Sequence, residues 1–412
     1  MREWTKLTIQ GGKRLIEKKK APKLRFPGFT DDWEQRKLGE ISKYSNGGSY
    51  ENDVVENGTY ELITLKSVNM SGKLVSSGKF INRETKTLEK DTLVMILSEQ
   101  APGLLGMTAQ IPENNKYVLN QRVAEIKPNT NIDSYFLSMS INRSQVYFSK
   151  RGAGTKVQNI SKPNVENFEF YCPSEREQQK IGSFFKQLDD TIALHQRKLE
   201  HTKDLKKSML QKMFPKKGEK NPEIRFPGFT DDWEQRKLGD VFDERSERAS
   251  GNEELLSVTI SNGVIRQIDS EKRNIASEDK SNYKVVKKGD VPYNSMRMWQ
   301  GAVGTSDYDG IVSPAYTVLI PKNNCNGKFF MELFKKQPTL EIFKRWSQGL
   351  TSDTWNLKYP VLSTIPFMVP SVKEQEKIAE YFKSLDNLIT LHQRELEHLK
   401  LLKKGLLQQM FV

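Results

Sequence analysis

Cysteine is scarce in this 412-residue chain, which contains only Cys172 and Cys325. Two cysteines so far apart exclude a disulfide framework and a cysteine-based zinc site, and they are typical of a reducing compartment. No stretch of the sequence approaches the ~18 consecutive apolar residues that a membrane span needs. The N-terminus is basic and lacks the apolar stretch of a secretory signal. These absences predict a cytoplasmic protein without membrane contact.

The common motifs of catalysis are also missing. The sequence contains no G-x-x-x-x-G-K-S/T phosphate loop, no H-E-x-x-H zinc motif, and no Pro-Pro pair of the kind found in the catalytic loop of adenine methyltransferases. The four histidines are His195, His201, His392 and His398. A spacing of six places the two histidines of each pair on different faces of a helix, so they do not form a metal site together. We therefore expect no catalytic residue, no metal and no cofactor in this chain.

Basic residues are in excess. Lys and Arg number 65 against 52 Asp and Glu, which gives a formal net charge of +13. An excess of this size is typical of proteins that bind a polyanion, and nucleic acid is the commonest polyanion in the cytosol. Charge alone does not identify the partner, and a basic protein without a polyanionic partner remains an open alternative.

One stretch, RFPGFTDDWEQRKLG, occurs twice without change, at Arg25–Gly39 and at Arg225–Gly239. An identical repeat of this length indicates a tandem duplication. Its Phe-Pro-Gly-Phe segment predicts a turn. Trp33 and Leu38 are predicted to anchor the start of a domain, so the repeat is interpreted as a packing element that closes a domain edge and not as a functional site.

The rest of the chain follows the same duplicated plan. Short apolar runs such as 60–65, 92–98 and 123–126 predict strands, and a helix is predicted near 134–151, which indicates an α/β (α+β) domain with polar loops. The predicted organisation is a basic leader at 1–21, a first variable domain at 22–173, a long helix at 174–214, a linker at 215–224, a second variable domain at 225–370 and a second long helix at 371–412.

The two long helices share a 4-3-4-3 spacing of apolar residues that predicts a coiled-coil seam. Ser174 followed by Glu177 predicts a capping box at the start of the first helix. Roughly 40 residues at ~1.5 Å each make a rod of about 60 Å. The predicted seam residues are Ile181, Phe185, Leu188, Ile192, Leu199, Met209, Ile378, Phe382, Leu385, Ile389, Leu396 and Leu406.

If the second helix packs along the first, it runs back antiparallel, and a pseudo-twofold axis relates the two halves of the chain. Dimeric DNA readers place their half-sites about one helical turn apart, ~34–36 Å centre to centre. Because the two variable domains differ in sequence, the two half-sites are expected to differ as well.

The repeated frame resembles the specificity (S) subunit of type I restriction-modification systems. The resemblance rests on RFPGFTDDWEQRKLG before each domain and on EQQKI…LHQRKLEH and EQEKI…LHQRELEH after each domain. It implies that each variable domain is a target recognition domain for one part of a split double-stranded DNA site. It also implies that the helices set the spacer and bind two methyltransferase subunits, that restriction subunits complete the complex, and that S-adenosylmethionine, ATP and Mg are bound by these partner subunits. The implied role is sequence recognition without catalysis.

Reading bases requires Arg, Lys, Asn and Gln presented from loops, and affinity requires Lys and Arg on phosphates. Three loop stretches in each variable domain meet this requirement at corresponding positions. The candidate DNA-binding residues are Gln100, Gln121, Arg122, Arg151, Lys156, Gln158, Asn159, Asn294, Arg297, Trp299, Gln300, Thr351 and Ser352. A coiled-coil scaffold for protein partners that does not read DNA remains the alternative function.

Overall fold

The computed structural model describes residues 21–412 with the exception of 101, 251–252, 271–278 and 353. Apart from residue 21, the predicted leader lies outside the described residues. The chain divides into two compact units, a first unit of Met1–Leu194 with Glu395–Val412 and a second unit of His195–Arg394. These boundaries differ from the predicted domain boundaries because each unit contains part of both long helices.

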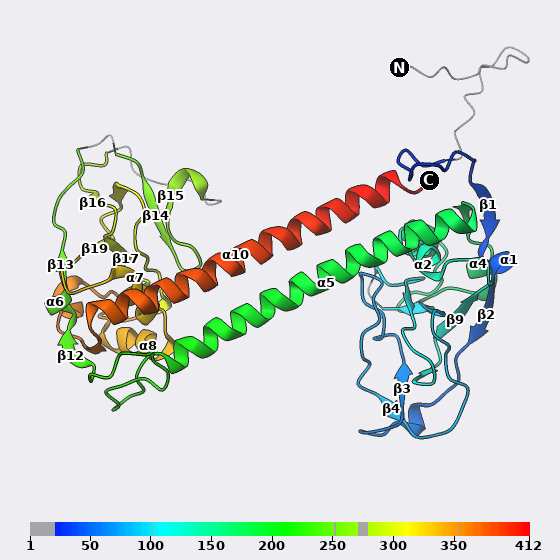
Figure 1. The fold of residues 1–412 in the computed structure, drawn as a ribbon, viewed down its shortest axis with the longest axis horizontal. Helices are drawn as coiled ribbons and strands as arrows, with labels where there is room; N and C mark the ends of the chain where they lie inside the picture. Colours follow the sequence, from blue (N-terminus) through cyan, green and yellow to red (C-terminus); the bar gives the residue numbers. More distant parts are fainter. Residues whose placement is uncertain (1–20, 101, 251–252, 271–278, 353) are drawn as a thin grey trace, which may run out of the picture. The chain divides into compact units, whose positions relative to one another are not determined.

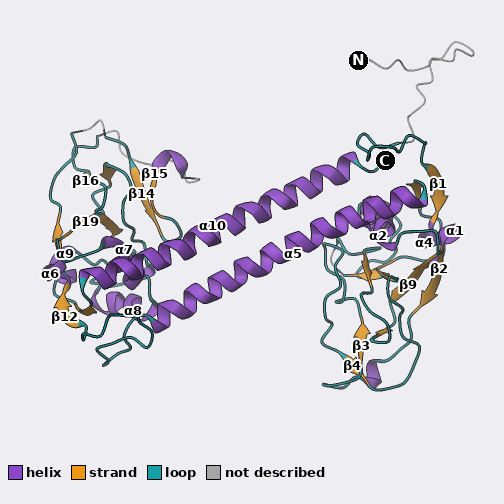
Figure 2. Cartoon of the chain, viewed as in Figure 1, coloured by secondary structure: helices purple, strands orange, loops and turns teal. Residues whose placement is uncertain are grey.

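The first unit is a mixed α/β domain (Figures 1 and 2). Its strands are β1 Glu34–Lys37, β2 Ser42–Asn46, β3 Tyr60–Ile63, β4 Phe80–Ile81, β5 Leu93–Ile96, β6 Ser98–Glu99, β7 Thr108–Gln110, β8 Tyr117–Leu119, β9 Val123–Pro128, β10 Gln158–Asn159 and β11 Glu169–Cys172. Its short helices are α1 Leu38–Ile41, η1 Glu51–Asp53, α2 Ser134–Asn142, α3 Gln145–Ser149 and α4 Lys162–Glu166. The main sheet has the order β2-β9-β5-β7 and is antiparallel. The helix predicted near 134–151 is two helices, because Ser144 leaves the helical conformation between α2 and α3.

The second unit has the same class of fold with different strands. They are β12 Glu234–Lys237, β13 Phe242–Glu244, β14 Leu256–Thr259, β15 Gly263–Arg266, β16 Lys284–Val286, β17 Val291–Asn294, β18 Gly310–Val312, β19 Tyr316–Pro321 and β20 Pro366–Val369. Its short helices are α6 Leu238–Val241, η2 Gln267–Asp269, η3 Met298–Gln300, α7 Gly327–Phe334, α8 Gln337–Trp346 and α9 Tyr359–Leu362. Its sheet β13-β19-β17 corresponds to β2-β9-β5 of the first unit.

The repeated stretch forms the first strand of a two-stranded ribbon that closes the variable domain of each unit. In the first unit β1 pairs antiparallel with β11, with Glu34 opposite Cys172 and Lys37 opposite Glu169. In the second unit β12 pairs with β20 in the same manner. The first and last strands of each domain therefore lie side by side, and the residues between them form an insertion into a constant frame.

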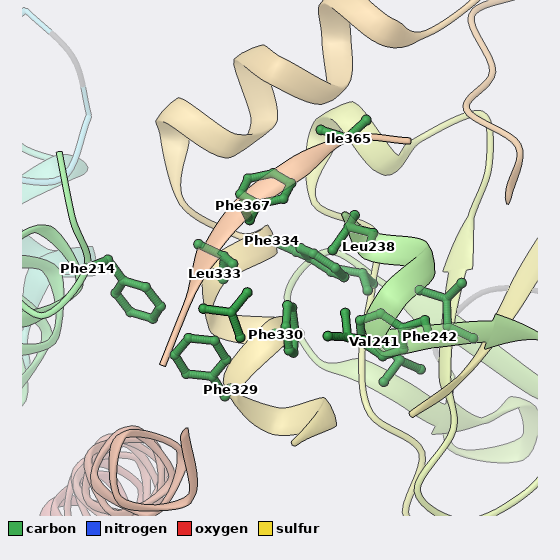
Figure 3. Close-up of a cluster of buried hydrophobic side chains, with 14 of the residues drawn as sticks. Phe214, Leu238, Val241, Phe242, Phe329, Phe330, Leu333, Phe334, Ile365 and Phe367 are labelled. Atoms are coloured by element: carbon green, nitrogen blue, oxygen red, sulfur yellow. The ribbon is translucent and has the colours of Figure 1, made fainter. Parts of the chain in front are cut away.

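Beneath each ribbon the repeated tryptophan is buried against a phenylalanine from the end of a long helix. Trp33 is 2% exposed, and its ring centroid lies 5.8 Å from that of Phe136 and 6.2 Å from that of Phe411. In the second unit Trp233 lies 6.1 Å from Phe214. Figure 3 shows Phe214 beside Phe329 in this core, where their rings stack at 5.4 Å.

The long helices are α5 Glu175–Lys212 and α10 Val372–Gln409, each an unbroken helix of 38 residues (Figure 2). Ion pairs join them in each unit. Lys403 donates to Asp189 at 2.7 and 2.9 Å in the first unit, and Lys206 donates to Asp386 at 2.8 and 2.7 Å in the second. In the first unit the neighbouring residues Leu24 and Arg25 bond to Gln409 on α10 and to Glu177 on α5. In the second unit Ile224 and Arg225 bond to Lys212 on α5 and to Glu374 on α10. Together with the ion pair in each unit, these contacts show that the helix segments run antiparallel within each unit.

All twelve predicted seam residues are buried or half-buried. Some of them also pack in the hydrophobic core of a unit. Ile181 and Phe185 belong to the core of the first unit, and Ile378 and Phe382 belong to that of the second. The seam therefore continues into the cores of the two units. No described helix is both long and apolar enough to cross a membrane.

A buried ion pair fixes the repeat to the start of each long helix. The guanidinium of Arg25 donates to both carboxylate oxygens of Glu177, at 2.8 and 2.6 Å. Arg225 binds Glu374 in the same way, at 2.9 and 2.7 Å. The prediction that Glu177 completes a capping box is therefore wrong, because its carboxylate is bound by an arginine 152 residues away in the sequence.

We expect Phe411→Ala to destabilise the first unit and not the second. The substitution leaves a cavity beside Trp33 and Phe136, and loss of a buried Phe costs about 3–5 kcal/mol. Hydrogen exchange followed by mass spectrometry should show faster exchange in β5 and unchanged exchange in β17. Leu401→Ala, at a 70% exposed residue of the same helix, is the control. Equal protection of β5 in the variant and the wild type would contradict this core assignment.

We also expect Arg25→Ala to destabilise the first unit strongly, because it leaves the carboxylate of Glu177, 1% exposed, without its partner. Breaking a buried pair in this way costs about 3–5 kcal/mol. Arg36→Ala, which removes the exposed ion pair with Glu34, should cost less than about 1 kcal/mol. Urea unfolding of the three proteins measures both effects, and equal losses for the two variants would refute the proposed role of the buried pair.

Candidate DNA interface

In the first unit the three predicted loop stretches meet at Leu97. The backbone N–H of Leu97 donates to the carbonyl of Arg122 at 3.0 Å, and its carbonyl accepts from the N–H of Ile160 at 3.0 Å. Next to it, β6 pairs with β10, which places Ser98 opposite Asn159. Segments around residues 98–100, 120–122 and 150–159 thus form one surface.

The same junction recurs in the second unit around Ser295. Its N–H donates to the carbonyl of Ala315 at 3.2 Å, and its carbonyl accepts from the N–H of Leu357 at 2.9 Å. Ser295 therefore holds together the segments 293–300, 313–316 and 348–356. The predicted correspondence between the loops of the two halves is seen in the backbone, while the side chains that the two junctions present are different.

Several candidates of the first unit are free to contact a ligand. Gln100, Arg122 and Lys156 are exposed. Arg122 has a left-handed backbone conformation, with φ of 66°, and a non-glycine residue held there is often found at a functional position. Arg151 is exposed as well, but its guanidinium lies 3.7 Å from the centroid of the Tyr147 ring. This stacking orders a long side chain before any ligand arrives.

Other candidates of the first unit already use their amides within the protein. Gln121 donates to Glu51 at 2.7 Å. Hydrogen bonds to Glu51 from Asn120 and Gln121 lower the pKa of this carboxyl to about 2. Gln158 donates to the carbonyl of Gly154, and the side-chain oxygen of Asn159 accepts from the hydroxyl of Ser98. These amides hold the loops in place, so their reading of bases stays a prediction without support from the geometry.

In the second unit Arg297 is exposed, and its guanidinium has no partner within the described part of the chain. Gln300 is half-buried. The side-chain oxygen of Asn294 accepts from the N–H of Met296 at 3.0 Å. The indole N–H of Trp299 donates to the carbonyl of Met296 at 3.1 Å. Arg297 is therefore the strongest candidate in this segment, and Trp299 is committed to packing.

The remaining candidates lie on the last loop of the second unit. Thr351 and Ser352 are both exposed. The backbone N–H of Thr351 bonds to the hydroxyl of Thr354 at 3.1 Å, so Thr351 helps to shape the loop. Trp355 packs edge-on against Trp299, with ring centroids 5.4 Å apart. This contact ties the loop to the segment that carries Arg297.

A cavity of about 860 Å³ adjoins Arg297 and was not predicted from the sequence. It is lined by the β14–β15 hairpin, by Asn294 and Arg297, and by Ser313, Ala315 and Tyr316. The Asn262-Gly263 pair between two apolar runs is a hairpin signal. This signal could have identified the β14–β15 hairpin, which forms one wall of the cavity.

The described residues contain no cluster of three or more His, Cys, Asp or Glu that could hold a metal ion. Both cysteines are free. Burial raises the pKa of the Cys172 thiol to about 11 and that of Cys325 further. Thiols in this state are poor nucleophiles and poor metal ligands. The surfaces around Leu97 and Ser295 present exposed basic side chains, among them Arg122, Lys156 and Arg297.

Known proteins share this architecture. The family described as "Type I restriction modification DNA specificity domain" matches residues 30–203 and 230–401. The chain is 25% identical over 414 residues to the type I restriction enzyme MjaVIII specificity subunit of Methanocaldococcus jannaschii, covering 93% of this chain and 92% of that protein. It is 25% identical over 188 residues to the HindI specificity subunit of Haemophilus influenzae, covering 44% of this chain and 41% of that protein.

The fold is similar to the crystal structure of a type I restriction-modification S subunit from M. genitalium. The TM-score is 0.63 at 16% identity, over 95% of this chain and 99% of that one. The family matches two segments that together span most of the chain, one in each half of the duplication. The chain therefore belongs to the type I restriction-modification DNA specificity family, and it is a DNA sequence-recognition subunit with two specificity domains in tandem.

Proposed function

We propose that the two units read the two halves of one bipartite, asymmetric DNA site. The observation that carries this proposal is the repeated junction at Leu97 and Ser295. The backbone hydrogen bonds are equivalent in the two units, whereas the exposed side chains, such as Arg122 and Lys156 in one unit and Arg297 in the other, differ. Equivalent scaffolds with different side chains are suited to reading different base sequences.

We further propose that the long helices set the spacer between the half-sites and bind two methyltransferase subunits, with restriction subunits joining the complete complex. Each helix is continuous over 38 residues, which suits a spacer. Exposed leucines on these helices, suited to a protein partner, are Leu194, Leu388, Leu391, Leu401 and Leu402. The chain itself supplies no catalysis, and the partner subunits bind S-adenosylmethionine, ATP and Mg.

Footprinting of the chain with its methyltransferase partner tests the bipartite site. We expect two protected segments of different sequence separated by an unprotected or sequence-independent spacer. Binding should weaken steeply with salt, because phosphate contacts release counterions. One continuous protected segment would contradict the two-reader proposal, and affinity that does not depend on salt or DNA sequence would favour a protein scaffold.

Substitution of one exposed arginine in each unit tests which unit reads which half of the DNA site. Arg297→Ala should relax the sequence requirement in one half-site, and Arg122→Ala should relax it in the other. Each lost base contact should cost about 1–3 kcal/mol. Sequencing of methylated bases in cells that carry each variant measures the effect, with Arg36→Ala as the control. Relaxation of both halves by one substitution would contradict the assignment.

A further inference from the structure

Each unit contains a short loop, here called the tip loop, built on the same backbone plan. In the first unit it runs from Ala153 to Asn159, whose backbones form an isolated antiparallel bridge, and in the second it runs from Gln348 to Asn356, which form the same bridge. In both loops the residue after the first bridge residue is a glycine with positive φ, 130° for Gly154 and 150° for Gly349.

The glycine is required at both positions. A Cβ at Gly154 would lie 2.0 Å from the carbonyl oxygen of Val157, and one at Gly349 would lie 2.6 Å from that of Thr354. No side chain fits there without moving the opposite backbone. The loops differ in length, with five residues between the bridge residues in the first unit and seven in the second. In each loop one residue follows the glycine directly, Thr155 in the first unit and Leu350 in the second.

The two tips differ in chemistry. Thr155 is exposed and polar, whereas Leu350 is a large apolar side chain that is 100% exposed. The loop beneath Leu350 is held by backbone hydrogen bonds from the N–H groups of Thr354 and Trp355 to the carbonyl of Thr351, at 2.9 and 3.1 Å. These bonds hold the described residues that follow Leu350, and residue 353 of the loop lies outside the described residues. An exposed leucine gains by leaving water when a partner covers it.

The surroundings of the Leu350 loop are basic and belong to the candidate DNA interface. The ammonium of Lys344 lies 5.7 Å from the ring of Trp355. Lys344 and Arg345 are exposed at the end of α8, just before the loop. Trp355 in turn packs on Trp299, in the segment of Arg297. An apolar tip flanked by cations matches DNA, because the cations can bind phosphates while the tip reaches the bases.

We propose that Leu350 is a wedge that enters the base stack of the half-site read by the second unit, whereas the tip with Thr155 leaves the other half-site stacked. Apolar side chains inserted between base pairs unstack the step and kink the duplex. Recognition by the second unit then depends on how easily a particular base step deforms, as well as on direct contacts. This inference rests on the proposed function.

The test uses the full chain with its methyltransferase subunits and a duplex of the sequence found methylated in the host. 2-Aminopurine replaces adenines near the second half-site one at a time, except at the methylated adenine, which a methyltransferase extrudes itself. We expect a rise in fluorescence on binding at one step of that half-site. Leu350→Ala should abolish the rise and weaken binding about tenfold, the size typical of one lost base contact. Leu350→Met should retain both.

Thr155→Ala is the matched control and should leave the fluorescence signal unchanged. Because Leu350 is fully exposed, its substitution should not alter thermal stability. A fluorescence rise that persists in Leu350→Ala overturns the proposal, and so does loss of methyltransferase binding without an effect on DNA. A duplex with deoxyuridine in place of thymine tests for a contact with the thymine methyl group. If this duplex reproduces the loss of binding without a fluorescence change, Leu350 contacts the methyl group and is not a wedge. Failure of the wild-type complex to prefer this duplex would refute the proposed function itself.

Discussion

The structure of each unit depends on a tryptophan of the repeat that packs against a phenylalanine from the end of a long helix. Trp33 contacts Phe411, and Trp233 contacts Phe214. The core of the first unit therefore includes the last residues of the chain, and the backbone N–H of Leu24 donates to the carbonyl of Gln409 beside them, near the C-terminus in Figure 1. The two units of the duplicated chain therefore have equivalent cores. Each core includes residues at the end of a long helix, and another part of that helix belongs to the other unit.

This constraint separates the constant parts from the variable parts. The ribbons and the buried arginine–glutamate pairs recur at equivalent positions because they close the domains. The lysine–aspartate pairs recur as well and join the two long helices in each unit. Asp189 illustrates how tightly they are held. Burial raises its pKa, but hydrogen bonds from Lys403 and Tyr135 outweigh burial and hold the pKa below its usual value. Between these fixed contacts the loops differ, and the residue that follows the glycine of the tip loop is Thr155 in one unit and Leu350 in the other.

Much of the frame could be predicted from the sequence, because an identical repeat and a 4-3-4-3 spacing report local packing directly. The partner of Glu177 could not be predicted, since Arg25 is distant in the sequence and a capping box uses the same residue types. The candidate readers were harder still. Gln158 and Asn159 offer the same amides to a base edge and to a neighbouring loop, and only the fold shows that the loop receives them. The role of Gly349 depends on a carbonyl across the loop, which no local pattern reveals.

The central claim is that the frame is constant and that each unit reads its own half-site. The most direct measurement exchanges residues 240–365 for the corresponding segment of another member of the family and sequences the methylated bases in the host. The account predicts that one half of the bipartite site changes while the other half and the spacer length stay the same. A change in both halves, or an unchanged site, would contradict it.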